Sequence, residues 1–445
     1  MSAAAGLVAR AAGLAARVAA GPLPLLAHGR LVRGDAVLAD VEGLSAPVGA
    51  LLAIETPAGD LPAEVAAVAG ERLRLLRLAP GPLRAGDRVR RLSDDGTIGV
   101  GPGLLGRACD SLGAPLDGGP RPAAEARWPL AGRPVPPLAR AEIDRALPTG
   151  VRAIDALFTL GLGQRLGLIA GTGVGKSVLL QQLLRGIAAD AVVLALIGER
   201  GREIAGFLEA LPAGLRARTH VVAEPADRAP ALRIRAAKRA LAAAEWLRST
   251  GAHVLLLMDS LSRVALAARE LGLALGEPVG LRGYPASALA LIPALVERAG
   301  RDSASGGAIT ALFTLLAEGD DSLGDPVVDA ARGALDGHIL LDREIAARGA
   351  FPAIDVARSI SRTMDRVVDS AHRAAASACR RDWALAEGAR DLLAMGAHVP
   401  GQDEALDRAL ARRGALAALI EQPAEARAGF EATRALLIGT WGEAA

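Results

Sequence analysis

The sequence predicts an α/β protein whose central domain holds a parallel β-sheet, preceded by a small β-barrel and followed by a helical domain. The central prediction depends on four continuous apolar runs, at Leu166–Ala170, Ala191–Ile197, Val254–Met258 and Ile309–Leu316. Runs without alternation are typical of strands that are buried on both faces, as in a parallel sheet covered by helices. Helical stretches such as Ser177–Ile187 separate these runs, as the crossover connections of such a sheet require.

The first hundred residues have a different pattern. Residues 1–25 predict an amphipathic helix whose apolar face consists of Leu7, Ala11, Leu14 and Val18. Residues 26–95 contain short apolar pieces broken by glycine and proline, and they predict a small barrel or sandwich with strands at Val48–Ile54, Glu64–Val68 and Leu73–Leu78. A connector rich in proline and glycine follows at residues 115–140. The region 370–445 is mostly helical, with breaks at Gly396, Pro400–Gly401 and Pro423.

The composition excludes several classes of protein. The 51 basic and 49 acidic residues give a net charge of +2, without the basic excess of a general nucleic-acid binder. Four tryptophans, one tyrosine and five phenylalanines are too few for extensive base stacking. No apolar run reaches the roughly 18 residues of a membrane span. Cys109 and Cys379 lack the spacing of a metal site or a disulfide scaffold, so we expect a reducing cytoplasm.

A phosphate-binding loop follows the first apolar run and opens a helix. It consists of Gly171, Thr172, Gly173, Val174, Gly175, Lys176, Ser177 and Val178. Glycines let backbone N–H groups surround phosphate oxygens, and the start of the helix adds partial positive charge. Lys176 can reach the β and γ phosphates as a point charge, and the Ser177 hydroxyl can ligate Mg²⁺. The usual motif has glycine where Ala170 stands, so the match depends on its strand-to-helix context.

Two carboxylates follow other apolar runs at their ends. Asp259 comes directly after Val254–Met258, where such an aspartate usually holds Mg²⁺ through water. Glu199 follows Ala191–Ile197 within a Gly-Glu-Arg-Gly-Arg-Glu segment. Since the carboxyl ends of parallel strands share one edge of a sheet, we expect both acids beside the phosphate loop. Each acid alone would be interpreted as an ordinary loop carboxylate. The prediction therefore depends on both acids occurring together with the phosphate loop.

These segments resemble the catalytic domain shared by rotary ATP synthase subunits and the ATPases of flagellar and type III protein export. The resemblance is strong over roughly residues 95–365 and weaker on both sides. It is carried by ordered matches at Gly198–Glu203, Asp259–Arg263, Gly276–Pro278, Arg282–Pro285, Leu295–Gly300, Glu318–Asp321, Leu335–Ile339 and Pro352–Asp355. It implies a RecA-like ATPase domain over residues 96–369 that hydrolyses ATP with Mg²⁺.

The resemblance also implies roles for individual residues. Glu199 would polarise the water that attacks the γ-phosphorus, supported by Arg200, and Arg263 would lie near the γ-phosphate. Arg362, in Ser-Ile-Ser-Arg, is similar to the arginine finger that reaches into a neighbouring subunit. Phe351 occupies a position where the family often has a tyrosine that stacks on adenine. By residue type alone, Arg362 would pass for a surface arginine and Phe351 for a core residue.

The assembly implied is a homohexamer at the inner face of the bacterial cytoplasmic membrane. Its expected partners are a stator protein at the N-terminus, a stalk protein in the ring centre, the export gate and complexes of substrates with chaperones. No nucleic acid is expected, and membrane association would be peripheral.

Among the family's members, an export ATPase is favoured over a rotary synthase subunit by the Gly-Glu-Pro and Arg-Gly-Tyr-Pro segments. Flagellar export is favoured by the overall sequence of residues 254–365. A virulence-type injectisome ATPase remains an alternative. A rotary ATP synthase catalytic subunit is disfavoured by the lack of an acidic Asp-Glu-Leu-Ser-Glu-Glu-Asp stretch. A RecA-like nucleic-acid translocase is a further rival, and a noncatalytic ring subunit would lack an acid at Glu199.

Overall fold

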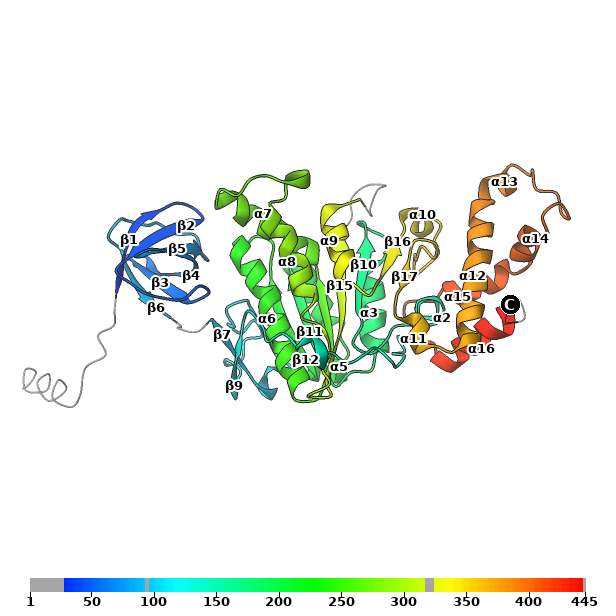
Figure 1. Ribbon diagram of the computed structural model, residues 1–445, viewed down its shortest axis with the longest axis horizontal. Helices are drawn as coiled ribbons and strands as arrows, with labels where there is room; N and C mark the ends of the chain where they lie inside the picture. The colour runs from blue at the N-terminus through cyan, green and yellow to red at the C-terminus, as the bar shows by residue number, and fades with distance from the viewer. Residues whose placement is uncertain (1–27, 93–95, 317–323, 443–445) are drawn as a thin grey trace, which may run out of the picture. The chain divides into compact units, whose positions relative to one another are not determined.

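The computed structural model describes residues 28–92, 96–316 and 324–442 (Figure 1). The chain divides into two compact units, one that ends at Gly96 and one that begins at Thr97. The expected amphipathic helix at residues 1–25 and the family match at Glu318–Asp321 lie outside the described residues. Within the described ranges, no helix is long and apolar enough to cross a membrane.

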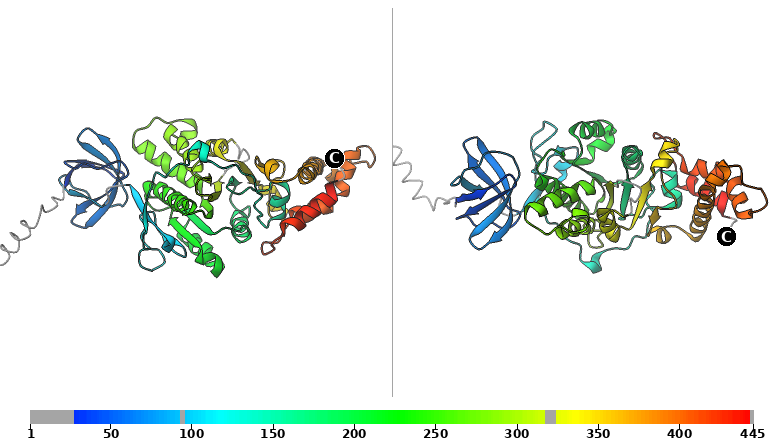
Figure 2. Two further views of the ribbon diagram at one scale, coloured as in Figure 1. Left: turned by 60° about the horizontal axis from the view of Figure 1, so that its bottom comes forward. Right: turned by 90° about the horizontal axis from the view of Figure 1, so that it is seen from above.

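The N-terminal unit is a closed barrel of six antiparallel strands in the order β1-β2-β5-β4-β3-β6 (Figure 2). The strands are β1 Gly29–Gly34, β2 Leu38–Glu42, β3 Leu51–Thr56, β4 Gly59–Ala69, β5 Arg72–Arg77 and β6 Arg88–Arg91. Side chains alternate between the interior and solvent, so that Val41, Leu52 and Leu75 are buried inside. Closure removes the exposed strand edges that an open sheet of this size would have. The predicted small barrel is confirmed.

The second unit is built on a sheet with the strand order β17-β16-β10-β15-β13-β11-β12-β8, in which β14 also pairs with β15. Its strands are β8 Ala108–Cys109, β10 Arg165–Ala170, β11 Ala191–Ile197, β12 Thr219–Glu224, β13 His253–Asp259, β14 Gly300–Arg301, β15 Ala308–Leu316, β16 Gly337–Leu341 and β17 Ile360–Ser361. All neighbours pair in parallel except β14 with β15 and β16 with β17. The four apolar runs therefore form the buried parallel strands that the sequence predicts. A separate two-stranded ribbon pairs β7 Thr97–Val100 with β9 Ala126–Pro129. β9 lies within the expected connector at residues 115–140, and β7 precedes that connector.

Helices cover both faces of this sheet, as parallel strands require (Figure 1). They are α2 Arg152–Leu157, α3 Lys176–Gly186, α4 Gly201–Glu209, α5 Ala213–Ala217, α6 Pro230–Ser249, α7 Leu261–Ala274, α8 Ala286–Val296, α9 Pro326–Ala334 and α10 Arg343–Ala347. Short 3₁₀ turns occur at Pro102–Leu104, Pro137–Ala139 and Leu281–Gly283. Successive residues of one strand enter opposite cores: Leu194 of β11 packs with α3, and Val193 packs with α6.

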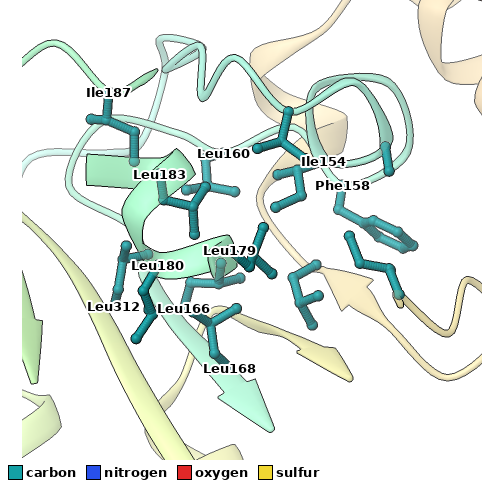
Figure 3. Packing of buried hydrophobic residues seen from close by; sticks show 14 of the residues in the cluster. Ile154, Phe158, Leu160, Leu166, Leu168, Leu179, Leu180, Leu183, Ile187 and Leu312 are labelled. Atoms are coloured by element: carbon teal, nitrogen blue, oxygen red, sulfur yellow. The ribbon is translucent and has the colours of Figure 1, made fainter. Parts of the chain in front are cut away.

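The helix that follows the phosphate loop is fixed by one of these cores. Leu179, Leu180 and Leu183 of α3 are buried at helical spacing and pack against Leu166 and Leu168 of β10 (Figure 3). Each such leucine contributes about 1.5–3 kcal/mol by leaving water. The start of α3 is therefore held rigidly at the carboxyl end of β10.

The C-terminal helices gather beyond the β16–β17 edge of the sheet (Figure 1). They are α11 Met364–Val367, α12 Ser370–Gly388, α13 Arg390–Ala394, α14 Glu404–Ala411, α15 Arg413–Ile420 and α16 Phe430–Trp441. Cys379 of α12, Leu419 of α15 and Trp441 of α16 share a hydrophobic core with the sheet face that α3 covers. The expected domain boundary near residue 370 remains a prediction, because these helices form one compact unit with the sheet.

Candidate functional site

The carboxyl ends of four neighbouring strands surround one cavity of about 650 Å³. Its wall contains the phosphate loop after β10, Gly198 and Glu199 after β11, Asp259 at the end of β13 and Leu316 at the end of β15. This is the edge at which open α/β sheets bind ligands. The sequence prediction that these groups lie together agrees with their placement around this cavity.

The phosphate loop has the backbone that its glycines permit. Gly173 and Gly175 adopt positive φ values of 81° and 88°, which residues with a Cβ atom rarely adopt. Gly175 precedes α3, whose first N–H groups have no partner within the helix and can face an anion. Ser177 is exposed at the cavity, whereas Val174 is buried in the core and could offer a ligand only its backbone.

Lys176 is bound by a carboxylate from a strand two positions away in the sheet. Its Nζ lies 2.6 Å from Oδ1 of Asp259, and the same oxygen accepts a hydrogen bond of 2.6 Å from Oγ1 of Thr314. Thr314 belongs to β15, which separates β10 from β13. The side chain of Asp259 is only 8% exposed, and charge-assisted hydrogen bonds of this length are strong ones. Thr314 was not identified from the sequence, because it lies inside an apolar run.

Glu199 is the second carboxylate near the lysine. Its Oε1 lies 3.8 Å from Nζ of Lys176. Burial raises the pKa of Glu199 above its usual value, and the negative charge of Asp259 raises it further, while Lys176 opposes both. A carboxylate with a raised pKa at a phosphate site is a good candidate for a group that orients or deprotonates water.

Two arginines of the predicted site border the same cavity. Arg263 lies in the first turn of α7, where its backbone N–H donates to the hydroxyl of Ser260, the residue that caps the helix. Among the described residues its buried Nε has no hydrogen-bond partner, which leaves it available to an anion. Arg200 is largely exposed, at 71% of its side chain, and its nearest acid is Glu203 at 3.8 Å.

Arg362 lies far from this cavity within its own chain. Its backbone N–H donates to the carbonyl of Asp336, just before β16 begins, whereas the phosphate loop follows the end of β10. In the pairing of these strands, Leu166 opposes Gly337 and Ala170 opposes Leu341. The four residue steps from Leu166 to Ala170 correspond to about 13 Å along the strand. The side chain of Arg362 is exposed, so it can act at a phosphate site only if that site belongs to another subunit.

A second cavity of about 820 Å³ adjoins the phosphate loop on its other side. Gly173, Gly175 and Val178 line both cavities. The ring of Phe351, 44% exposed, lies against Gly175, where an added Cβ atom would meet it at 3.4 Å. Most of the remaining wall is apolar, as expected of a pocket for a flat aromatic base. An exposed phenylalanine in an apolar cavity agrees with the predicted binding role better than with a core role.

The C-terminal helices supply much of that second wall, which sequence reasoning missed. The wall contains residues 417, 418 and 421–424, at the end of α15 and just after it. Gln422 is 3% exposed and fixes this segment. Its amide donates 2.8 Å bonds to the carbonyls of Gly150 and Ala426, and its oxygen accepts from the N–H of Arg152 at 2.9 Å. The break at Pro423 was the only signal in the sequence, and it does not indicate a pocket.

The donor set suits a small, hard divalent cation held with a nucleotide. No cluster of three or more metal-ligating His, Cys, Asp or Glu side chains occurs among the described residues. The Ser177 hydroxyl and the Asp259 carboxylate face the same cavity and are oxygen donors, which Mg²⁺ prefers. The residues present therefore fit a cation that is bound chiefly by phosphate oxygens.

Comparison with known proteins identifies two regions. Residues 150–361 match the nucleotide-binding domain of the ATP synthase alpha/beta family, and residues 368–438 match the C-terminal domain of the type III secretion ATPase EscN. The flagellum-specific ATP synthase of Pseudomonas aeruginosa is 44% identical, with 94% of this chain and 93% of the relative covered. That of Salmonella typhimurium is 45% identical, with 91% of each covered. The type 3 secretion system ATPase of Xanthomonas euvesicatoria is 41% identical, with 92% and 93% covered.

Solved structures give the same result. The assembled ATPase EscN of the enteropathogenic E. coli type III secretion system superimposes with a TM-score of 0.87 at 38% identity, covering 93% of this chain and 99% of that one. EscN in complex with its central stalk EscO gives a TM-score of 0.85 with the same identity and coverage.

Proposed function

This chain belongs to the ATP synthase alpha/beta family and is an ATPase of the flagellar and type III secretion kind, and from that premise we propose that it serves flagellar protein export. The observation that carries the export role is the match of its C-terminal helices, residues 368–438, to the C-terminal domain of the type III secretion ATPase EscN. A rotary ATP synthase catalytic subunit is disfavoured by that match. The flagellar system is favoured over an injectisome by flagellar relatives at 44% and 45% identity over more than nine-tenths of the chain.

The proposed chemistry assigns one task to each group of the cavity. Lys176 binds the β and γ phosphates together with the N–H groups of the loop. Ser177 and Asp259 would hold Mg²⁺, which neutralises charge on the phosphates when it is bound. Glu199 orients and polarises the attacking water and accepts its proton, so that the water oxygen bonds to the γ-phosphorus as the bond from that phosphorus to the bridging oxygen of ADP breaks, which releases inorganic phosphate and ADP. Arg263 neutralises charge on the γ-phosphate.

The site is complete only in an assembly. Arg362 lies beside the amino end of β16, and the phosphate loop follows the carboxyl end of β10, yet the exposed side chain of Arg362 is of the kind that stabilises a transferred phosphoryl group. We assign it to the site of the neighbouring subunit in a homohexameric ring. The relative EscN has been seen assembled and with a central stalk, which supports both a ring and a stalk partner for this chain.

Further partners follow from the proposed export role. They are a stator protein that binds residues 1–25, the export gate, and substrates with their chaperones. We propose peripheral association with the cytoplasmic face of the membrane through these partners. Deleting residues 1–20 should then leave basal ATP hydrolysis largely intact and abolish capture of the purified stator protein.

One experiment separates export from the rival classes. ATP hydrolysis by the full chain is measured alone, with RNA, and with an unfolded flagellar export substrate bound to its chaperone. Stimulation by the substrate complex and not by RNA supports export. Stimulation by RNA alone would indicate a nucleic-acid translocase, and no hydrolysis in any mixture would contradict the assignment of an ATPase.

A further inference from the structure

The segment that carries Arg362 has little backbone support of its own. It follows β17, which has only two residues and pairs with β16 at Gly337–Ser361 and His338–Ile360. The N–H of Arg362 donates to the carbonyl of Asp336 at 2.8 Å. The guanidinium of Arg362 makes a long hydrogen bond of its own, from Nη1 to the carbonyl of Leu335 at 3.4 Å, and neither this contact nor so short an edge strand fixes the direction of a long side chain firmly. Other contacts must hold the backbone around Arg362 in place.

Gln164 supplies those contacts from the residue just before β10. Its side chain is fully buried, and its amide is shared between the two residues that flank Arg362. Nε2 donates to the hydroxyl of Ser361 at 3.2 Å, and Oε1 accepts from the hydroxyl of Thr363 at 2.7 Å. Oε1 also accepts from the N–H of Gly161 at 2.8 Å, which fixes the amide itself. A buried amide with every atom engaged holds one orientation.

The residues around Gln164 also hold the backbone near Arg362 rigidly. Asp336, whose carbonyl accepts from Arg362, is held by two bonds of 3.0 Å from the guanidinium of Arg165. Gly337 allows the close approach of β17, since a Cβ atom there would lie 2.5 Å from the carbonyl oxygen of Ile360 and 3.3 Å from Nε2 of Gln164. Gln164 therefore lies at the centre of a packed junction, whereas the side chain of Arg362 leaves it exposed.

We propose that Gln164 is a positioning residue for Arg362, and that it sets the direction in which the guanidinium reaches the neighbouring subunit. This inference rests on the proposed role of Arg362 across the interface. An arginine finger acts only when its guanidinium is correctly placed, since a displacement of about 1 Å can lower a rate about 100-fold. Gln164 lines neither of the two cavities beside the phosphate loop, and in this proposal its effect on turnover passes through Arg362.

A second route of influence has to be separated from this one. Gln164 precedes β10, and the phosphate loop follows the other end of the same strand. A change at Gln164 that disturbed β10 would damage the subunit's own ATP site rather than its neighbour's. The two routes predict opposite results when variant subunits are mixed in one ring.

The test uses Gln164→Met, which keeps the size of the side chain and removes both hydrogen-bonding atoms. Alone, it should lower kcat at least about tenfold and leave nucleotide affinity close to that of the wild type. Mixed with Glu199→Gln, it should regain activity, because some sites then pair an intact Glu199 with a well-placed Arg362. Mixed with Arg362→Ala, it should regain none, since no well-placed finger is present.

The opposite pattern would overturn the proposal. If Gln164→Met is rescued by Arg362→Ala and not by Glu199→Gln, the damage lies in the subunit's own site. A mixture of Arg362→Ala with Glu199→Gln serves as the reference: if it fails to regain activity, the interface role of Arg362 fails independently of Gln164.

Thr363 provides the second variant. Thr363→Val removes the hydroxyl that donates to Gln164, and in mixed rings it should be rescued by the same partner variant as Gln164→Met. Thr363→Ser keeps the hydroxyl and should turn over ATP as the wild type does. If Gln164→Met does not fold, the Thr363 pair decides the question. Equal turnover of Thr363→Val and Thr363→Ser would contradict the proposal.

Discussion

Nζ of Lys176, at the start of α3, lies 2.6 Å from Oδ1 of Asp259, although β10, which leads to α3, is separated in the sheet from β13 by β15. The pair joins the group proposed for phosphate with the group proposed for the metal. In the proposed mechanism, Lys176 would turn to the phosphates and Asp259 to Mg²⁺ when the nucleotide binds. In the absence of substrate, the Lys176 ammonium and the Asp259 carboxylate therefore neutralise each other within the cavity.

Breaking this pair from either side should have different consequences. Lys176→Ala should weaken ATP binding and abolish hydrolysis, because it removes the cation proposed to bind the β and γ phosphates and leaves the buried carboxylate unpaired. Asp259→Asn should keep metal-free ATP binding, lose the tightening of binding by Mg²⁺, and lower hydrolysis about 100-fold or more. Titration with a fluorescent ATP analogue, with and without Mg²⁺, measures both. Undiminished tightening by Mg²⁺ in Asp259→Asn would rule out the metal assignment.

Glu199→Gln should separate binding from chemistry. The amide keeps the shape of the side chain but cannot accept a proton, so we expect hydrolysis to fall by about two orders of magnitude with ATP affinity retained. Glu209→Gln, at an exposed position on α4, is the control and should behave as the wild type. Near-normal turnover in Glu199→Gln would exclude the assigned role.

The pH dependence of kcat/KM should report the same carboxyl group. Burial, followed by the charge of Asp259, raises the pKa of Glu199 above 4.5. Its active form is the carboxylate, so activity should be lost as the pH falls through this raised pKa. The acid limb should therefore lie above pH 4.5 while circular dichroism shows an intact fold. An acid limb at or below that pH would contradict the assignment.

Phe351 should affect substrate binding and leave the chemical step unchanged. Phe351→Ala removes the ring beside Gly175 and should raise KM for ATP about tenfold or more with a similar kcat, since base stacking contributes about 1–3 kcal/mol. Phe351→Tyr keeps the ring and should bind as the wild type does. Steady-state kinetics of the two variants give the answer. An unchanged KM in Phe351→Ala would show that the base binds elsewhere.

Gln422 should couple fold stability to nucleotide affinity. Gln422→Ala removes the hydrogen bonds to the carbonyls of Gly150 and Ala426 and the acceptor of the Arg152 N–H, each with a typical net contribution of about 0.5–1.5 kcal/mol. We expect a lower melting temperature and a raised KM for ATP, because the pocket wall at residues 417–424 loses its anchor. Gln402→Ala, at an exposed position of the same helical region, is the matched control. A wild-type KM together with a lower melting temperature would limit Gln422 to a stabilising role.

The parts of the site that follow strand ends could be predicted from the sequence. The phosphate loop and Asp259 come directly after a continuous apolar run, and Glu199 follows another run after a single glycine. Parallel pairing places the ends of such runs on one edge. The barrel and the sheet follow from alternating and continuous burial in the same way. These signals are local, so a single sequence contains them.

Thr314, Gln422 and Gln164 could not be predicted, because their partners come from distant parts of the chain. Thr314 reaches Asp259 only because β15 inserts between β10 and β13. Gln422 meets Gly150 across 272 residues, and Gln164 meets Thr363 across 199. Such contacts depend on the order of strands and on the docking of the last helices, and no local pattern encodes either.

The central claim is that ATP is hydrolysed between subunits, by Glu199 of one chain and Arg362 of the next. The most direct test mixes inactive Glu199→Gln and Arg362→Ala chains in equal amounts, assembles rings and measures ATP hydrolysis. In a randomly mixed ring, about one interface in four combines an intact Glu199 with an intact Arg362, so the mixture should regain about a quarter of wild-type activity. A mixture that stays as inactive as its two components, in rings shown to contain both chains, would contradict the account.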